Sequence, residues 1–317
     1  MNFLKKHSYF VAFVLLLFVP LLTNNYSQYL VNLILVYILV TLGFNLLVGY
    51  VGRFSFGNAA FFGIGAYSVG LLMRSLNMPF WFSLPIAGLI SAIVGLLVGL
   101  PALRLHRYYL AIVTLAFTNL MKFVYIHGGT FTYGPSGFDI PNPTIFGFSF
   151  SDDKRVSYIV LVVFFLMLFL VRNLTKSRIG RALSATKGGE NAAEALSIDT
   201  KKAVLLAFTM SGFVVGVSGG LFCIVMKRIT PDCFGMSELL RHFIMVVLGG
   251  LGSITGSMIG ATIIILLPEF LRSIQGIQEM VFGLLIVVFV LFAPQGLYGF
   301  ILKVIPGISR EKLYQDG

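Results

Sequence analysis

The sequence has little charge, two cysteines and no motif for an energy source or a catalytic centre. Only 11% of its 317 residues are Asp, Glu, Lys or Arg, against about 25% in an ordinary soluble domain. A soluble core of this size could not bury a chain that is 57% hydrophobic, so we expect a lipid bilayer as its solvent. The predicted fold class is an all-α polytopic membrane protein.

The missing motifs exclude whole classes of activity. The two cysteines, Cys223 and Cys233, form no disulfide framework and no Cys/His cluster for a metal. The chain has no G-x-x-x-x-G-K-[ST], no G-x-S-x-G and no H-E-x-x-H. No paired polar residues at one depth suggest an intramembrane enzyme. We therefore predict no catalytic residues, no metal and no cofactor, and an energy source supplied from elsewhere.

The net charge of +11 could suggest nucleic-acid binding. The basic residues, however, cluster at the ends of apolar runs rather than along one face. This is the distribution that the positive-inside rule predicts for a membrane protein. We therefore expect the surface of the chain to contact the lipid bilayer and not a nucleic acid.

A helix needs about 20 apolar residues to cross a bilayer. The first run could be a cleaved signal peptide, but no small-residue cleavage site follows it, so we interpret it as an uncleaved crossing. The candidate segments are Ser8–Leu22, Tyr29–Gly49, Phe54–Leu72, Phe80–Leu103, Tyr108–Tyr125, Val156–Val171, Ala203–Met226, Leu239–Leu271 and Ile277–Ala293.

The segment Leu239–Leu271 is too long for one simple crossing and is interrupted by glycines. We predict two half-helices that form a re-entrant hairpin, which is tolerated at membrane depth where protein or a water-filled cavity covers the break. With about eight crossing helices besides this hairpin and both termini cytoplasmic, most of the 23 Lys and Arg residues lie inside. A single crossing by this segment gives a smaller bias, so the hairpin is preferred.

Two connections are long, and neither looks like a domain boundary, so residues 1–317 are expected to form one integral membrane domain. Residues 128–155 are external in this topology. Their Gly and Pro content suits a compact irregular lid, and a plain connecting loop fits equally well. The near absence of charge deep in the spans argues against an ion-coupled secondary carrier, because proton and ion pathways display such residues.

Small residues gather in the third, seventh and broken segments. Close helix packing through small-xxx-small contacts explains most of them. A second interpretation is that the third span and the broken segment line a translocation pathway, with a Gly/Ala wall and a few polar points. The candidate pathway residues are Ser55, Asn58, Gly63, Thr114, Asn119, Gly250, Gly252 and Ser253.

The polar segment Arg178–Asp199, called the coupling segment below, stands out in an otherwise apolar chain. Ile179, Ala182 and Leu183 recur at helical spacing, as do Ala192, Ala195 and Leu196, and two glycines separate the sets. The pattern predicts two short amphipathic helices. A basic loop on anionic headgroups is one interpretation, but the acidic, Ala-rich second half favours docking into a protein groove.

Five blocks of sequence carry a resemblance to a known family. They are SFGNAAFFGIGAY, LPALRLHRYYLAIVTLAF, GRALSATKGGENAAEALSID, VLGGLGSITGSMIGA and FAPQGLYG, and they span almost the whole chain. In this order they resemble the permease subunits of ATP-binding cassette (ABC) importers for branched-chain amino acids, of the "M" type. One departure is Asn58, where many members carry histidine.

The resemblance implies a non-enzymatic permease in the cytoplasmic (inner) membrane that translocates leucine, isoleucine or valine. It implies a second, similar permease, two cytosolic ATPase subunits that bind ATP, and an extracytoplasmic amino-acid-binding protein. Urea or short amides as cargo, or an ion-coupled carrier, stay open as alternatives. The residues it places against the ATPases are Arg178, Gly180, Arg181, Ala182, Leu183, Ala192, Ala195 and Leu196.

Overall fold

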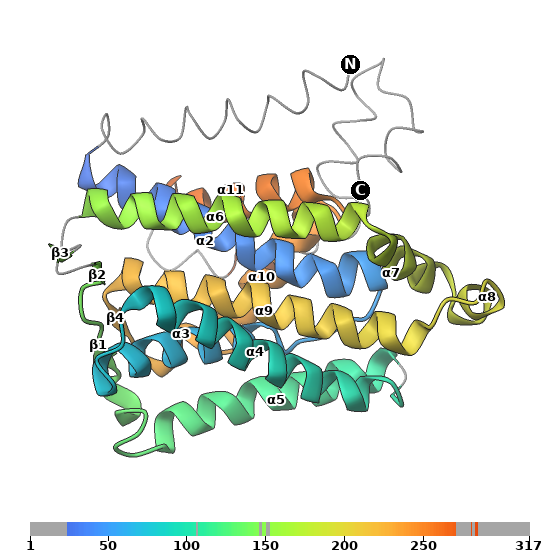
Figure 1. Cartoon of the computed structure of the whole chain (residues 1–317), viewed down its shortest axis with the longest axis horizontal. Coiled ribbons are helices and arrows are strands. Elements are labelled where there is room, and N and C mark those ends of the chain that lie inside the picture. The colour runs from blue at the N-terminus through green and yellow to red at the C-terminus, as the bar shows by residue number, and fades with distance from the viewer. Residues whose placement is uncertain are drawn as a thin grey trace.

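The computed structural model describes residues 24–105, 107–145, 148–149 and 153–270, together with residues 280, 283 and 284. This part of the chain is mostly helical (Figure 1). The helices are α2 (Asn25–Asn45), η1 (Leu46–Val51), α3 (Asn58–Ser75), α4 (Phe80–Ala102), α5 (Arg107–His127), η2 (Gly134–Ser136), α6 (Asp153–Lys176), α7 (Arg178–Gly188), α8 (Glu190–Ala195), α9 (Thr200–Met226), η3 (Pro231–Phe234), α10 (Met236–Gly249) and α11 (Ile254–Phe270).

Five helices in the described residues are long and apolar enough to cross a membrane. They match five of the predicted crossings and occupy Asn25–Val51, Phe80–Ala102, Tyr108–His127, Lys154–Lys176 and Thr200–Met226. The predicted segment Ser8–Leu22 and nearly all of Ile277–Ala293 lie outside the described residues. The predicted count of eight crossings and the cytoplasmic position of both termini therefore stay predictions.

Helix α9 forms the centre of the body and packs against α2, α3 and α4 (Figure 1). Glycines allow these helices to approach with their backbones in contact. A Cβ atom at Gly65 of α3 would overlap the carbonyl of Gly216 in α9, and one at Gly219 would overlap the carbonyl of Phe62. Small-residue packing of this kind is a main source of helix association in membranes, where lipid removes the hydrophobic driving force.

Helix α3 starts later than its apolar run. The predicted crossing began at Phe54, but residues 52–57 have no regular structure and the helix begins at Asn58. Side chains of α5 hold this irregular backbone: the amide of Phe56 donates to Thr114 Oγ1 at 2.7 Å, and Thr118 Oγ1 donates to the Phe56 carbonyl at 2.6 Å. The segment is thus fixed by hydrogen bonds from a neighbouring helix rather than by its own helical ones.

The broken helix predicted within Leu239–Leu271 is present. Helix α10 ends at Gly249, α11 begins at Ile254, and residues 250–253 form the turn between them. The two helices run antiparallel with their backbones in contact, because a Cβ at Gly249 would overlap Gly256 and one at Gly260 would overlap Met245. The glycines that interrupt the apolar run therefore serve both the turn and the contact.

Four strands of two residues each lie at one end of the body (Figure 1). They are β1 (Phe138–Asp139), β2 (Thr144–Ile145), β3 (Phe148–Ser149) and β4 (Arg228–Ile229). The antiparallel pairs are β1 with β4 and β2 with β3. The Arg74 guanidinium lies over the Tyr133 ring and donates to the Asp139 carbonyl at 3.0 Å. The first part of the connection after α5 is thus attached to the helix ends, and its position outside the membrane and its role as a lid stay predictions.

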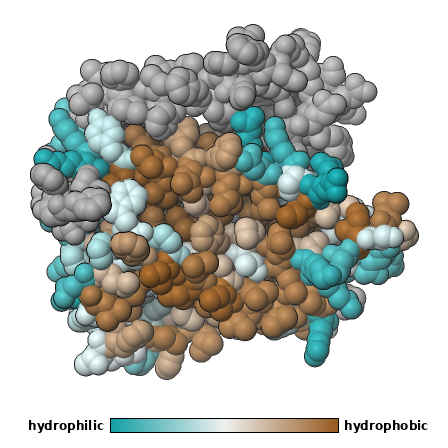
Figure 2. Space-filling model, viewed as in Figure 1, coloured by the Kyte–Doolittle hydropathy of each residue, from teal (hydrophilic) through white to brown (hydrophobic). Residues whose placement is uncertain are grey.

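The coupling segment forms α7 and α8, which project from the opposite end, called the coupling end below (Figure 1). Between the two ends Figure 2 shows a broad apolar belt with hydrophilic residues at its margins. Large apolar side chains on α4, α5 and α6 are exposed, among them Phe82, Ile112 and Phe169. An exposed belt of this extent is what a lipid-facing surface requires.

Candidate functional site: the coupling segment and the broken helix

Helix α7 begins at a side-chain cap. Ser177 Oγ accepts hydrogen bonds from the amides of Ile179, at 3.1 Å, and Gly180, at 3.4 Å. These amides have no partner within the helix, so a serine before the first turn stabilises its start. The helix ends at Gly188 and Gly189, and Gly189 has a φ of +153° that a side chain would resist. The predicted pair of short helices with a glycine break is therefore present.

Only part of the predicted apolar faces remains available to a partner. Leu183 and Gly180 pack inward, and a Cβ at Gly180 would overlap the carbonyl of Thr175. Ala182 is half-buried. The side chains that face outward are Arg178, Ile179, Arg181, Ala192, Ala195 and Leu196, with Leu196 74% exposed. The inward face of α7 thus packs against the helical body, and the exposed apolar side chains of α8 and of Leu196 remain available to a partner.

Two polar contacts attach the coupling segment to η1 and to the irregular segment before α3. Lys187, in the last turn of α7, donates from Nζ to the carbonyl of Gly49 at 2.7 Å. Although Lys187 as a whole is exposed, its ammonium group lies against backbone, and partial burial lowers its pKa below the ordinary value. Glu190, the first residue of α8, forms an ion pair with Arg53. The contacts therefore lie on either side of the glycine break.

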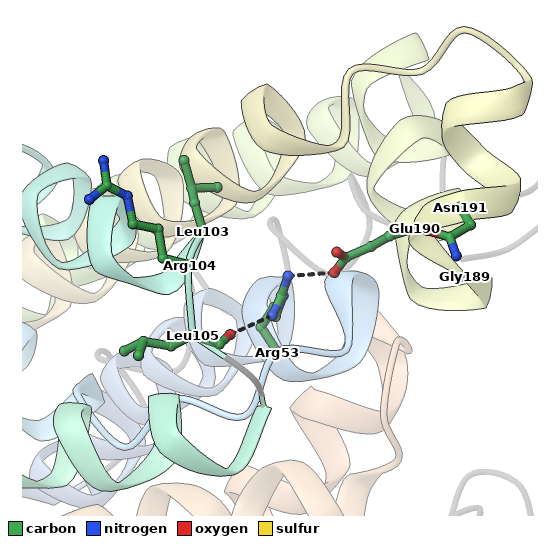
Figure 3. A pocket seen from close by; sticks show the side chains of 7 residues that line it. All are labelled: Arg53, Leu103, Arg104, Leu105, Gly189, Glu190 and Asn191. Carbon is green, nitrogen blue, oxygen red and sulfur yellow. Dashed lines mark hydrogen bonds and ion pairs between the residues drawn. The ribbon is translucent and has the colours of Figure 1, made fainter.

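A pocket of about 510 Å³ lies beside the second contact (Figure 3). Its lining residues are Arg53, Leu103, Arg104, Leu105, Gly189, Glu190 and Asn191. The guanidinium of Arg53 is nearly buried and also donates to the Leu105 carbonyl at 3.3 Å. Figure 3 shows the Arg104 side chain pointing away from Arg53. The pocket thus lies between the connection from α4 to α5 and the start of α8, and Arg53 contacts both of them.

The turn of the broken helix is held by one buried asparagine. Asn45, near the end of α2, accepts from the amide of Gly252 at 2.9 Å through Oδ1. Its Nδ2 donates to the carbonyl of Ser253 at 3.1 Å and to Ser257 Oγ at 2.8 Å. Three hydrogen bonds from one side chain replace those that the interrupted helix lacks. Asn45 therefore ties the turn to α2 and η1.

The structure separates the predicted pathway residues into several environments. Ser55 and Thr114 are buried around the irregular segment before α3, and Gly250, Gly252 and Ser253 form the turn. Gly63 packs against the rings of Tyr125 and Phe234 and faces no open space. Asn119 is exposed on the outer face of α5. The predicted set thus does not form one polar lining, and its role in a pathway stays a prediction.

A buried polar cluster joins α2, α3 and α10. Glu238 accepts from the hydroxyl of Tyr37, lies 3.1 Å from Nη1 of Arg241, and lies 3.1 Å from Nε2 of His242. Asn58 Nδ2 lies 3.1 Å from Nδ1 of His242. Asn58, where many family members carry histidine, therefore contacts the side chain of a histidine in another helix, α10.

Sequence reasoning missed this cluster. It placed Glu238 and His242 at the margin of an apolar run, whereas His242 is fully buried and Glu238 nearly so. Glu238 lies in the first turn of α10, and the expectation of few charges deep in the spans stays a prediction. The i, i+4 spacing of the two residues was the available signal, since it puts an acid and an imidazole on one helix face. Asn45 was likewise visible as one of two asparagines within an apolar run, the other being Asn32.

Comparison with known families decides what this body is. The family described as "Branched-chain amino acid transport system / permease component" matches residues 26–293. The chain belongs to this family. The match begins in α2 and extends beyond α11, so it includes the coupling segment, the broken helix and the buried cluster.

Relatives of this permease family are named for the same transport system. The chain is 32% identical to the high-affinity branched-chain amino acid transport system permease protein LivM of Salmonella typhimurium, over 88% of this chain and 71% of that protein. It is 32% identical to LivM of Escherichia coli, over 92% and 75%. BraD of Pseudomonas aeruginosa is 26% identical over 87% and 96%. No solved structure matches the chain.

Proposed function

We propose that this chain is the membrane-spanning permease subunit of an ABC importer that carries leucine, isoleucine and valine across the cytoplasmic membrane. The observation that carries the proposal is the family match over residues 26–293, together with 32% identity to two LivM permeases along most of the chain. The chain has no P-loop, so ATP hydrolysis belongs to partner subunits, and the permease itself is not an enzyme.

The proposed assembly has two permeases, this chain and a homologous one, with two ATPase subunits at the coupling end. An extracytoplasmic binding protein delivers the amino acid at the end that carries β1 to β4. The coupling end is cytosolic in this arrangement, which the seven Lys and Arg residues between Arg172 and Lys202 support. The exposed apolar face of α8 supports contact with a soluble subunit, because Leu196, Ala192 and Ala195 have no partner within the described part of the chain.

The test is uptake by the complex reconstituted in proteoliposomes with the second permease, the ATPases and the binding protein. We expect labelled leucine to enter only when ATP is hydrolysed, and valine and isoleucine to compete. Competition by urea or acetamide in place of valine would move the cargo assignment to short amides. Uptake by this chain alone, driven by an ion gradient without ATP, would refute the ABC assignment and support a secondary carrier.

A further inference from the structure

We propose that Lys187 is a positioning residue that transmits displacement of the coupling segment to the turn of the broken helix. The inference rests on the proposed function, because it concerns how the work of the ATPases reaches the membrane-spanning helices. Helices α7 and α8 are continuous in sequence with α6 and α9, which offers one path for force. The contact of Lys187 with Gly49 provides a second path that ends at a different element.

The first step of this path is the contact itself. Gly49 lies in η1, whose last carbonyls have no helical partner and carry the negative end of the helix dipole. The Lys187 ammonium donates to one of them at 2.7 Å. The Lys187 stem also lies against Gly52, where a Cβ would be 3.1 Å from Cγ. The Lys187 ammonium is therefore attracted by the dipole of η1 as well as by the Gly49 carbonyl.

The second step leads from η1 to the turn. The amide of Gly252 packs directly on Gly49, so closely that a Cβ at Gly49 would overlap it. The same amide donates to Asn45 Oδ1, and Asn45 Nδ2 holds Ser253 and Ser257. Backbone contact and three hydrogen bonds leave the turn no freedom to move apart from η1. A displacement that reaches Gly49 is therefore passed to residues 250–253.

The ion pair between Arg53 and Glu190 does not provide the same path. It attaches α8 to the irregular segment before α3, and the side chain of Glu190 is 43% exposed. Lys187 precedes Gly188 and Gly189, whereas Glu190 follows them, so the break separates the two contacts. We therefore expect loss of Lys187 to affect the turn specifically, with the attachment of α8 preserved.

The test compares Lys187→Met, which keeps the length of the side chain and removes the donor, with Lys201→Met at an exposed lysine in the first turn of α9. In the reconstituted complex we expect Lys187→Met to retain ATP hydrolysis while leucine uptake per ATP falls about tenfold, as loss of a hydrogen bond from a charged donor would produce. Lys187→Arg should restore part of this ratio. A ratio equal to that of Lys201→Met would overturn the proposal.

A second measurement separates this inference from the proposed function. Amide hydrogen exchange of the purified full chain needs no partner and no transport. We expect exchange at Gly252 and Ser253 to be about tenfold faster in Lys187→Met, with α9 unchanged. Unchanged exchange at the turn would refute the role of Lys187. Faster exchange in a complex that shows no ATP-driven uptake would refute the proposed function alone.

Discussion

Two regions of this permease use glycine in opposite ways. In the middle of the body, Gly65 and Gly219 lie where α3 and α9 touch, and a Cβ at either would overlap a backbone carbonyl. At the coupling end, Gly188 has no atom within 4 Å of such a Cβ, and Gly189 meets only Ala192 at 3.9 Å. The first pair fixes helices against each other, whereas the second interrupts a helix in open space. Whether a glycine fixes two helices against each other or interrupts one helix therefore depends on the atoms around it, and not on how many glycines a region has.

The largest expected effect tests the rigid region. In Gly65→Val the new side chain has to displace the backbone of Gly216, so α3 and α9 separate along their contact. Backbone overlap cannot be relieved by a rotamer change, and we expect a loss of several kcal/mol, above the usual cost of about 1–3 kcal/mol for overpacking. The measurement is the yield of monodisperse protein in detergent and its thermal unfolding.

The matched control is Gly188→Ala in the open region, which should leave both yield and unfolding unchanged. Equal damage from both variants would show that α7 packs as tightly as the central helices. A well-behaved Gly65→Val protein would show that α3 and α9 are not in backbone contact.

The long helices and the glycine breaks were predictable from the sequence, because apolar runs and paired glycines are local signals. The start of α3 was not. The apolar run begins at Phe54, but hydrogen bonds from Thr114 and Thr118 hold Phe56 in an irregular conformation. These residues are about 60 positions away, and no local pattern reports such a contact. The inward face of α7 was hidden for the same reason, since α7 packs against η1, which lies far away in the sequence.

A second comparison sets the buried cluster around Glu238 against the coupling end, by removing one carboxylate from each. In Glu238→Ala the guanidinium of Arg241 and the imidazole of His242 lose a buried partner. The buried Tyr37 hydroxyl loses its acceptor as well, and each buried polar group left without a partner costs about 1–3 kcal/mol, so we expect a clear fall in the unfolding temperature of the purified protein in detergent.

The corresponding change at the coupling end is Glu190→Ala, which removes a carboxylate whose side chain is 43% exposed. Exposed ion pairs contribute less than about 1 kcal/mol, so this variant should unfold close to the wild-type temperature. A greater loss from Glu190→Ala than from Glu238→Ala would reverse our assignment of the rigid and mobile regions.

A smaller effect is expected at the start of α7. Ser177→Ala removes the acceptor for the amides of Ile179 and Gly180, and loss of such a cap costs about 1 kcal/mol of helix stability. Because α7 is short, the loss should appear as faster hydrogen exchange in its first turn rather than as a change in global unfolding. Ser177→Thr keeps a hydroxyl acceptor and should behave like the wild-type protein. Unchanged exchange in Ser177→Ala would mean that α7 is held by its body contacts alone.

The smallest effect on stability, and an informative one for function, is expected at Leu196. Its side chain is 74% exposed after α8, so Leu196→Ser should change the free energy of unfolding by no more than about 0.5 kcal/mol. If the outward face of α8 docks on an ATPase subunit, the same variant should lower ATP-driven leucine uptake, because an apolar side chain centred on an interface contributes far more there than in the free protein. Leu76→Ser, at another exposed leucine that follows α3 and is 66% exposed, separates loss of docking from loss of exposed apolar area. Stability and transport would then respond to different residues, as expected of a segment that projects from a rigid body in order to be moved.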